Sequence, residues 1–489
     1  MPPEGMLLGH VANEEVLLVR SGGEIFAVSP HCTHYQGPLA EGLVAGTILR
    51  CPWHHARFDL RTGEAVGAPA IDAIGCWEIE QRDGLISVGS KRKRQKSKQN
   101  DQTAEEPQKI VIVGGGAAGF AAAEMLRRRG YEGSLVMLSS DEALPCDRPN
   151  LSKDYLAGTI PFDYVPLKQE RFYAQNNIEI RLGRPVRELD VVNCQAVIAG
   201  EAIPYDRLLL ATGAEPVRLT IAGADQPHVH TLRSLADCQA IIEGTKSSRR
   251  AVVIGASFIG LEVAAALLKR ELEVHVVAPD KLPMERILGA EMGTFIRMLH
   301  EENGVVFHLE NKVVAIEGQA VRLETGATID ADLVVVGIGV RPRLELAEKA
   351  GLKIDRGVVV DQFLETSVPG IYAAGDIARW PDSYSGEAIR VEHWVVAERQ
   401  GQTAALNMIG HRTPFADAPF FWSQHYDVPI NYVGHADSWD EITIDGDIMS
   451  KDCLLRFKKN ARVAAVASIF RDLESLKSEL VMEQKKARA

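Results

Sequence analysis

The sequence predicts a multidomain chain in which a small all-β domain precedes a larger α/β portion and a C-terminal α+β domain. Two observations predict this architecture. The composition changes abruptly at residues 90–107, where basic and polar residues follow one another with almost nothing apolar. Beyond that segment, residues 110–119 (IVIVGGGAAG) are echoed by residues 251–260 (AVVIGASFIG), and both combine an apolar strand, a glycine-rich turn and the start of a helix. A length of 489 residues suffices for about three domains.

The first part of the chain contains short alternating apolar runs at 15–19 and 24–28, which are typical of β-strands. Residues 1–88 hold 11 acidic and 5 basic side chains, so half of the net charge of −12 lies there. This excess of acidic side chains could form part of a docking surface. The basic run that follows, from Lys91 to Lys98, is expected to be a solvated tether that weakly attracts the acidic domain.

Charge and hydropathy exclude several classes of protein. A net charge of −12 disfavours a nucleic-acid partner, because a phosphate backbone requires a positive field. Residues 1–20 lack the basic and apolar regions of an export signal. The most apolar window, 251–268, contains Glu262 and two glycines, so we expect no membrane span. Seven cysteines without a C-x-x-C pair suit a reducing, cytoplasmic compartment.

Four residues in the first domain have the spacing of metal ligands. Cys32-Thr33-His34 gives C-x-H, and Cys51-Pro52-Trp53-His54 gives C-x-x-H. Two thiolates and two imidazoles could hold a structural zinc ion, but a zinc finger usually groups its cysteines in one loop and its histidines in another. Here each loop supplies one of each. That order favours a 2Fe-2S cluster in which two cysteines hold one iron and two histidines hold the other.

The segments CTHYQGPLAEG and CPWHHARFDLRTGE resemble the Rieske family. The resemblance implies that Cys32, His34, Cys51 and His54 are the cluster ligands. His55 stands where the family often has glycine. Rieske proteins of high reduction potential carry an extra disulfide between the two loops, and the corresponding positions here are Gly37 and Trp53. The resemblance is therefore to Rieske-type ferredoxins. It implies a reduction potential toward the lower end of the Rieske range of about −150 to +300 mV.

The first glycine-rich turn predicts a dinucleotide site. Gly114, Gly116 and Gly119 form G-x-G-x-x-G between the strand 109–113 and a helix through Arg129, where a helix N-terminus can face a pyrophosphate. The next strand, 134–138, should be followed by an acid for the ribose. Ser140 follows instead, and the choice between Ser140, Asp141 and Glu142 stays open.

Segment 144–153 (LPCDRPNLSK) resembles that of FAD-dependent ferredoxin reductases and apoptosis-inducing-factor-like proteins, with Cys146 in place of the usual tyrosine. The resemblance implies that Arg148 contacts FAD and that Lys153 lies near the flavin ring. Thr212 and Gly213 are expected at the adenine half. Segment 366–376 resembles the second FAD motif of the family, in which Asp376 holds the ribityl chain, so the FAD domain is interrupted by an insertion.

The inserted repeat predicts an NAD(P)H site. Gly255, Ser257 and Gly260 form G-x-S-x-x-G, and the serine could loosen binding because it adds a side chain where backbone should touch the pyrophosphate. The strand 273–277 is followed by neither an obvious acid nor an obvious arginine, and we expect NADH. Segment 337–342, with Gly339, resembles the family's G-x-G-x-R-P.

Two further segments, EHW at 392–394 and FWS at 421–423, match these reductases. The resemblance places Glu392, His393 and Trp422 around the isoalloxazine, together with Lys153 as the catalytic set. No proton donor is needed for hydride transfer, since the cofactors carry that chemistry.

The predicted chain is therefore a Rieske-type ferredoxin fused to a glutathione-reductase-like flavoprotein of the apoptosis-inducing-factor-like subgroup. Electrons would pass from NAD(P)H through FAD and the 2Fe-2S cluster to an unknown acceptor protein. Two alternatives stay open: a redox-responsive signalling or binding protein, and the electron-input component of a ring-hydroxylating oxygenase or nitrite reductase. A homodimer is also left open.

The expected domain boundaries follow from these motifs. They are 1–89 for the Rieske domain, 90–107 for the linker, 108–225 and 350–412 for the two parts of the FAD domain, 226–349 for the NAD(P) domain, and 413–489 for the C-terminal domain.

Overall fold

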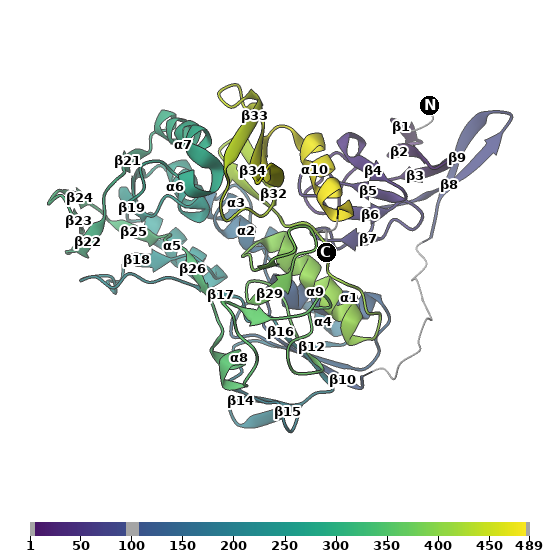
Figure 1. Cartoon of the computed structure of the whole chain (residues 1–489), viewed down its shortest axis with the longest axis horizontal. Helices are drawn as coiled ribbons and strands as arrows, with labels where there is room; N and C mark the ends of the chain where they lie inside the picture. Colours follow the sequence, from purple (N-terminus) through teal and green to yellow (C-terminus); the bar gives the residue numbers. More distant parts are fainter. Residues whose placement is uncertain (1–4, 94–106, 486–489) are drawn as a thin grey trace.

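The computed structural model describes residues 5–93 and 107–485. Most of the predicted linker, residues 94–106, lies outside the described residues. Figure 1 shows the N-terminal β domain beside helix α10 (Asp472–Gln484), with one parallel sheet below them and a second at the opposite side of the molecule. The predicted combination of one β domain with two dinucleotide-binding folds is confirmed.

The N-terminal domain consists of three antiparallel sheets. In the second strand, Leu17 and Val19 are buried and Leu18 between them is less so, which is the alternation expected of a strand with one buried face. The strands are β1 (Gly5–Val11), β2 (Glu14–Ser21) and β3 (Glu24–Val28); β4 (Leu43–Ala45), β5 (Ile48–Arg50), β6 (Arg57–Asp59) and β7 (Ala65–Gly67); and β8 (Trp77–Arg82) and β9 (Leu85–Lys91). The short helix η1 (Leu39–Glu41) precedes β4.

Strand β9 extends two residues into the segment predicted as linker. The ammonium group of Lys91 lies 2.7 Å from the carboxylate of Glu14, and the Arg92 guanidinium donates to the carbonyl of Arg61 at 2.9 Å. The beginning of the basic run is therefore bound to the β domain, because acidic side chains and a free carbonyl lie beside it.

The first dinucleotide-binding fold is a parallel sheet in the order β12-β11-β10-β16-β28. Its strands are β10 (Lys109–Val113), β11 (Ser134–Leu138), β12 (Ile178–Arg181), β16 (Arg207–Leu210) and β28 (Ile371–Ala373). The last strand comes from far along the chain, so the fold is interrupted by an insertion, as predicted. Helix α1 (Ala117–Arg128) packs against α9 (Trp394–Met408), and a Cβ on Gly401 would lie 2.1 Å from the Ala118 carbonyl. Only glycine permits this approach.

Short helices connect these strands. They are α2 (Arg148–Leu151), α3 (Asp154–Ala157), η2 (Phe162–Tyr164) and α4 (Glu170–Gln175). Two small sheets flank the fold. One is antiparallel and is formed by β13 (Glu188–Asp190), β14 (Gln195–Ile198) and β15 (Glu201–Pro204). The other is mixed: β27 (Val358–Val359) pairs in parallel with β29 (Ala378–Pro381), which pairs antiparallel with β30 (Ala388–Ile389).

The second dinucleotide-binding fold has the order β18-β25-β19-β20-β21. Its strands are β18 (Val229–Thr231), β19 (Arg250–Ile254), β20 (Glu273–Val277), β21 (Val306–His308) and β25 (Leu333–Val336), and its helices are α5 (Leu235–Thr245), α6 (Phe258–Lys269) and α7 (Glu285–Glu302). The strands β22 (Val313–Ile316), β23 (Ala320–Leu323) and β24 (Thr328–Asp330) form a side sheet, and α8 (Glu345–Lys349) follows. The pair β17 (Ala214–Pro216) and β26 (Val340–Pro342) connects this fold to the first.

The C-terminal domain is an antiparallel sheet of β31 (Phe420–His425), β32 (Val428–Gly434), β35 (Arg462–Ile469), β34 (Asp452–Lys459) and β33 (Glu441–Asp447), in that order, and ends in α10. Helix α10 contacts β32 and β35 on one side and β4 of the N-terminal domain on the other. The helix therefore joins the first and last domains of the chain. Among the described helices, none combines the length and apolar character of a membrane-spanning segment.

Candidate functional site

Two loops at one end of the β domain bring four donor side chains together. Cys32 follows β3 and Cys51 follows β5, and both thiols are buried and interact with each other, which together with burial raises the pKa of Cys32 far above its usual value. The Nδ1 atoms of His34 and His54 lie 3.2 Å apart. Burial lowers the pKa of His34 to about 3, so its ring is neutral and has a lone pair available at neutral pH.

The four side chains thus form a cysteine pair and a histidine pair. Within the described residues, no three Cys, His, Asp or Glu side chains converge on a position that would hold a single metal ion. Two separate pairs fit a binuclear cluster with two thiolates on one iron and two imidazoles on the other. They fit a tetrahedral zinc ion less well.

Gly37 lies against this site. A Cβ on Gly37 would lie 2.8 Å from the Cys51 sulfur and 3.2 Å from the Trp53 ring, so the two loops meet where only a glycine has room. Gly37 and Trp53 are the two positions at which the sequence excluded a bridging disulfide.

The first glycine-rich turn has no space for a side chain at Gly114 or Gly119. Gly114 has a φ of +121°, and a Cβ there would lie 2.0 Å from the carbonyl oxygen of Ala211; one on Gly119 would lie 1.9 Å from that of Gly114. A Cβ on Gly116 would lie 3.7 Å from the Arg148 guanidinium. This places a cation directly at the N-terminus of α1, where anions bind favourably.

A second arginine, Arg233, joins Arg148 at this place. Arg148 pairs with Asp141 at 3.0 Å and Arg233 with Asp376 at 2.6 Å. Burial, and then the proximity of Arg233, lowers the pKa of Arg148. The Nε of Arg233 is buried without a hydrogen-bond partner. Two half-buried guanidinium groups, one with an unused donor, at a helix N-terminus fit the diphosphate of FAD.

Of the remaining residues predicted to bind FAD, Gly213 and Asp376 lie beside Arg233, whereas Ser140 is exposed. Gly213 has a φ of +68°, and its missing Cβ would lie 3.4 Å from Arg233 and 3.9 Å from Asp376, so these residues converge. The Thr212 hydroxyl donates to the carbonyl of Arg343 at 3.0 Å. Ser140 is exposed, and its role toward the ribose stays a prediction.

Lys153 forms a buried ion pair that the sequence did not predict. Its Nζ lies 2.9 Å from Glu262, which is 4% exposed and also accepts hydrogen bonds of 2.5 Å from the hydroxyls of Ser152 and Ser423. The signal in the sequence is a single carboxylate in the middle of helix α6, which apart from its last residue, Lys269, is otherwise apolar.

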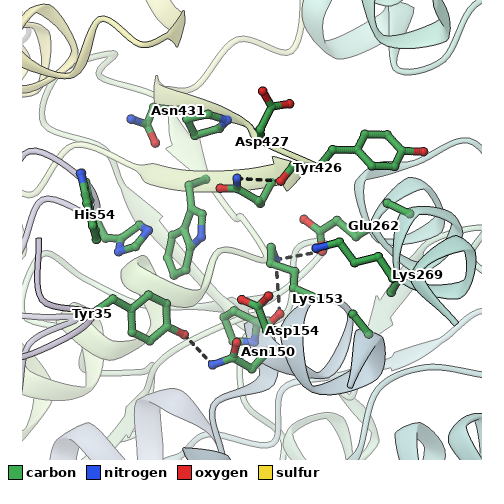
Figure 2. A pocket seen from close by; sticks show the side chains of 18 of the residues that line it. Tyr35, His54, Asn150, Lys153, Asp154, Glu262, Lys269, Tyr426, Asp427 and Asn431 are labelled. Carbon is green, nitrogen blue, oxygen red and sulfur yellow. Dashed lines mark hydrogen bonds and ion pairs between the residues drawn. The ribbon is translucent and has the colours of Figure 1, made fainter. Parts of the chain in front are cut away.

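Trp422 lies between this ion pair and the donor set of the β domain. Its ring centroid is 4.2 Å from that of His54, at an angle of 40°, and 6.0 Å from the Lys153 Nζ. Tyr35 stacks on His34 at 3.8 Å and accepts a hydrogen bond from Asn150 at 2.9 Å. Figure 2 shows Tyr35 and His54 on one side of a cavity of about 460 Å³, with Lys153 and Glu262 facing them.

His393 and Glu392, predicted beside the flavin, point to different partners. The His393 ring lies 4.5 Å from the ring of Phe421, and its Nδ1 is buried without a hydrogen-bond partner. Burial, with a smaller effect of His435, lowers the pKa of His393 to about 3. A neutral imidazole with an unused nitrogen fits a ring-binding position. Glu392 pairs with Arg390 at 2.5 Å.

The second glycine-rich turn repeats the close packing of the first. A Cβ on Gly255 would lie 2.4 Å from the carbonyl oxygen of Gly337, and one on Gly260 would lie 2.2 Å from that of Gly255. The Ser257 hydroxyl donates to the Gly337 carbonyl at 2.8 Å and accepts from the Gly260 amide, so it caps α6. Gly339 has a φ of +109° and open space around it. The serine that replaces the middle glycine therefore has a structural function.

Comparison with known proteins assigns both halves of the chain. Residues 108–401 match the family described as pyridine nucleotide-disulphide oxidoreductase, and residues 1–78 match the Rieske [2Fe-2S] domain. The chain belongs to the pyridine nucleotide-disulphide oxidoreductase family. Its N-terminal domain is a Rieske domain. The two matches imply FAD, NAD(P)H and a 2Fe-2S cluster.

Relatives of this oxidoreductase include the human apoptosis-inducing factor 3, which is 31% identical over 93% of this chain and 78% of that protein. The ferredoxin–NAD(+) reductase component of the biphenyl dioxygenase system of Paraburkholderia xenovorans is 37% identical over 70% of this chain and 85% of its own length. Among solved structures, the covalent putidaredoxin reductase–putidaredoxin complex matches with a TM-score of 0.75 and 32% identity, covering 78% of this chain and 94% of that chain.

The Rieske domain is held against the oxidoreductase by a buried ionic cluster around Glu479 of α10. Its carboxylate accepts from Arg50 at 2.9 Å and Arg399 at 2.6 Å, and lies 3.2 Å from the Nδ1 of His55. His55 has a φ of +59°, in the left-handed region that glycine adopts most readily. The sequence missed this function of His55, which is not among the predicted ligands.

Proposed function

We propose that this chain oxidises NADH and passes the electrons through FAD to a 2Fe-2S cluster held by Cys32, His34, Cys51 and His54, and from there to an acceptor protein. The contact between His54 and Trp422 is the observation that supports this proposal most directly. It connects the donor set of the Rieske domain to the predicted flavin site without an intervening layer of solvent.

The chemistry that FAD supplies is the conversion of a two-electron hydride into single electrons. Around it, the chain provides orientation and charge. Arg148 and Arg233 are proposed to bind the diphosphate, and Lys153, held by Glu262, to place a positive charge beside the ring, where negative charge develops on reduction.

His393 is proposed to contribute a neutral, unpartnered nitrogen at the ring edge, and Trp422 to exclude water between the ring and His54. Asp376 is proposed to hold the ribityl chain, since its carboxylate lies among Gly213 and Arg233. Glu392, turned toward Arg390, is proposed to position that arginine, which donates to the Asp376 carbonyl at 2.9 Å.

For the nucleotide, we propose NADH. The end of β20 is followed by Asp280, whose carboxylate lies 3.0 Å from Arg286, so this arginine is paired with an acid. A 2′-phosphate would have to compete with that carboxylate. The names of relatives that are NAD(+) reductases support the same choice. Comparing the rates of flavin bleaching by NADH and NADPH tests it.

The experiment that tests the main proposal is an anaerobic titration of the purified protein with NADH, followed by visible absorbance and electron paramagnetic resonance. The expected result is bleaching of the flavin and then the signal of a reduced 2Fe-2S cluster with mixed ligands. Flavin reduction with a cluster that stays oxidised would contradict internal transfer.

The acceptor is proposed to be a redox protein or an oxygenase component, because one similar protein is the reductase of a dioxygenase system. A signalling role is the second candidate. It is favoured by the similarity to human apoptosis-inducing factor 3 across both domains, and it predicts slow NADH oxidation that no redox protein accelerates.

A further inference from the structure

The tyrosine that follows the first predicted histidine ligand contacts both imidazoles. The Tyr35 ring stacks on that of His34, with centroids 3.8 Å apart and an angle of 12°, and it meets the His54 ring edge-on at 5.2 Å. Among the described residues, no group forms a hydrogen bond with the Nε2 atom of either imidazole. Histidine ligands are usually oriented by such a bond, so here the orientation of His34 depends on the ring that stacks on it.

The hydroxyl of Tyr35 is bound by residues of the predicted FAD domain. It donates to a carboxylate oxygen of Asp147. The side-chain amide of Asn150 donates to the same oxygen at 3.0 Å and to the Tyr35 hydroxyl at 2.9 Å. Figure 2 shows the bond between Tyr35 and Asn150 beside the cavity. The three polar groups thus form a closed triangle across the contact between two domains.

Asp147 and Asn150 are both buried, each with 6% of its surface exposed. Burying a carboxylate costs free energy unless hydrogen bonds compensate, and the second carboxylate oxygen of Asp147 has no partner. Apolar side chains of similar size would cross this contact without that cost. Hydrogen bonds provide what apolar contacts lack, because they fix both the distance and the direction of the group that they hold.

The same short segment carries two residues that are proposed to bind the flavin. Arg148, proposed at the diphosphate, lies between Asp147 and Asn150 in the chain, and Lys153, proposed beside the ring, follows three residues later. Segment 147–153 therefore serves the flavin site and also holds the first cluster loop. Because the rate of electron transfer falls steeply with distance, a direct connection between the two sites favours a fast step.

The second cluster loop is attached to other elements. The Nδ1 of His55 lies 3.2 Å from Glu479 of α10, and the carbonyl of His55 accepts a hydrogen bond from Arg399 of α9 at 2.8 Å. These contacts do not involve Tyr35. Loss of the Tyr35 hydroxyl should therefore leave the Rieske domain docked, so that its effect on electron transfer can be measured separately from docking.

We propose that Asp147 and Asn150 are positioning residues for the 2Fe-2S cluster, which hold the Tyr35 ring and thereby fix the orientation of His34 toward the flavin site; the inference rests on the proposed function. Each transfer moves one electron from the reduced flavin to the oxidised cluster, and no bond forms or breaks.

The test uses the full-length holoprotein. Stopped-flow absorbance after anaerobic mixing with NADH gives the rate of flavin bleaching and then that of cluster reduction. In Asp147→Ala and in Tyr35→Phe, cluster reduction should slow at least about fivefold relative to flavin bleaching in the same protein, because a hydrogen bond to a charged group is lost. Asp147→Asn should restore most of the rate, since an amide oxygen still accepts from the Tyr35 hydroxyl.

Asp72→Asn is the matched control. Asp72 of the Rieske domain also pairs across the contact, with Lys168 at 2.7 Å, but its side chain is 60% exposed. An exposed pair of this kind contributes little, so the relative rate of cluster reduction should stay within about twofold of the wild-type value. Reduction of each variant by dithionite, followed by electron paramagnetic resonance, measures whether the cluster itself is intact.

A readout independent of turnover is hydrogen–deuterium exchange of the oxidised holoprotein without NADH. In Asp147→Ala, the backbone amides of residues 32–37 should exchange at least about threefold faster than in the wild type, because the first cluster loop has lost its attachment. The amides of residues 51–56, in the second loop, should exchange as in the wild type.

Wild-type relative rates of cluster reduction in both Asp147→Ala and Tyr35→Phe, at normal flavin and iron content, would overturn the positioning role. Equal slowing in Asp72→Asn would overturn it as well, because docking as a whole would then control the rate. Unchanged exchange of residues 32–37 would do the same. A wild-type cluster that stays oxidised after the flavin is bleached would instead contradict the proposed function, so the two failures are distinguishable.

Discussion

At the scale of single residues, His54 and His55 are neighbours in the chain with opposite surroundings. The His54 ring faces His34 and Trp422, whereas the His55 ring stacks on Phe420 at 3.9 Å and is fully buried. The left-handed backbone at His55 turns the two side chains apart. His54 is the ligand proposed for iron, whereas His55 contacts Glu479 and helps to hold the domain in place.

This difference predicts that His54→Ala loses the cluster and His55→Gly keeps it. Glycine preserves the left-handed backbone, so the loop stays intact while the contact with Glu479 disappears. Iron content and the electron paramagnetic resonance signal after dithionite reduction measure the outcome. A full iron complement in His54→Ala would contradict the ligand assignment.

Trp422 is expected to matter for transfer to the cluster and not for the reaction with NADH. In Trp422→Ala, flavin bleaching should stay within about twofold of the wild-type rate, while cluster reduction slows by at least about tenfold. Stopped-flow absorbance separates the two steps. Trp439→Ala, in which a tryptophan that packs on Phe457 is lost, is the control. Equal slowing of both steps would show that Trp422 only supports the fold.

Site residues that belong to local motifs could be predicted from the sequence. The C-x-H loop lies against the C-x-x-H loop, and each glycine-rich turn is closely packed, as the patterns indicate. It was not sufficient for Arg233, Glu262 and Glu479, because their partners are 143, 109 and 429 residues away along the chain. No local pattern marks a contact of that kind.

At the scale of elements, α10 carries two carboxylates, Glu479 and Asp472, whose pKa values are shifted in opposite directions. Burial alone would raise the pKa of Glu479, but Arg399, His55 and Arg57 hold it well below its usual value of 4.5. Its ionisation therefore stabilises the docked fold above that pH, and the contribution is lost as the pH falls through the lower folded-state pKa.

Replacing this carboxylate should destabilise the protein strongly. Glu479→Gln leaves Arg50, Arg57 and Arg399 without their shared partner, and we expect a loss of about 3 kcal/mol at pH 7. Urea denaturation followed by the visible absorbance of the cluster measures it. Glu474→Gln on the same helix, whose partner Arg471 lies at 3.8 Å, should change stability little.

Asp472, at the start of α10, should behave in the opposite way. Burial, with a smaller effect of Glu41 in the Rieske domain, raises its pKa from 3.8 to about 6. Its ionisation therefore destabilises the folded state above pH 6, and this penalty is absent below about pH 4. Asp472→Asn should be more stable than the wild type by about 2 kcal/mol at pH 8, with the difference gone at pH 4. A constant difference across this range would refute the assignment.

At the scale of the whole molecule, the charges at the domain contact differ from the average charge of the Rieske domain. The sequence predicted that a basic tether weakly attracts this acidic domain, and Lys91 at the start of the basic run pairs with Glu14. At the contact with α10 the signs are reversed, because Arg50 and Arg57 of the Rieske domain bind Glu479 and Glu483. Composition describes an average, whereas docking depends on which side chains lie at the contact.

Because the Rieske domain is docked within the same chain, its reduction should be intramolecular. The rate of cluster reduction after mixing with NADH should stay constant over about a tenfold range of protein concentration. A rate proportional to concentration would mean that the cluster of one molecule is reduced by another.

The orientation of His34 and His54 has a consequence for traffic through the protein. Both imidazoles lie at the edge of the Rieske domain that contacts Tyr35 and Trp422, so an electron-acceptor protein cannot bind at that edge while the domain is docked. Electrons are therefore expected to enter and leave the proposed cluster by different routes. Either the acceptor binds on the cysteine side, near the exposed indole of Trp53, or the Rieske domain dissociates from the oxidoreductase before the acceptor binds.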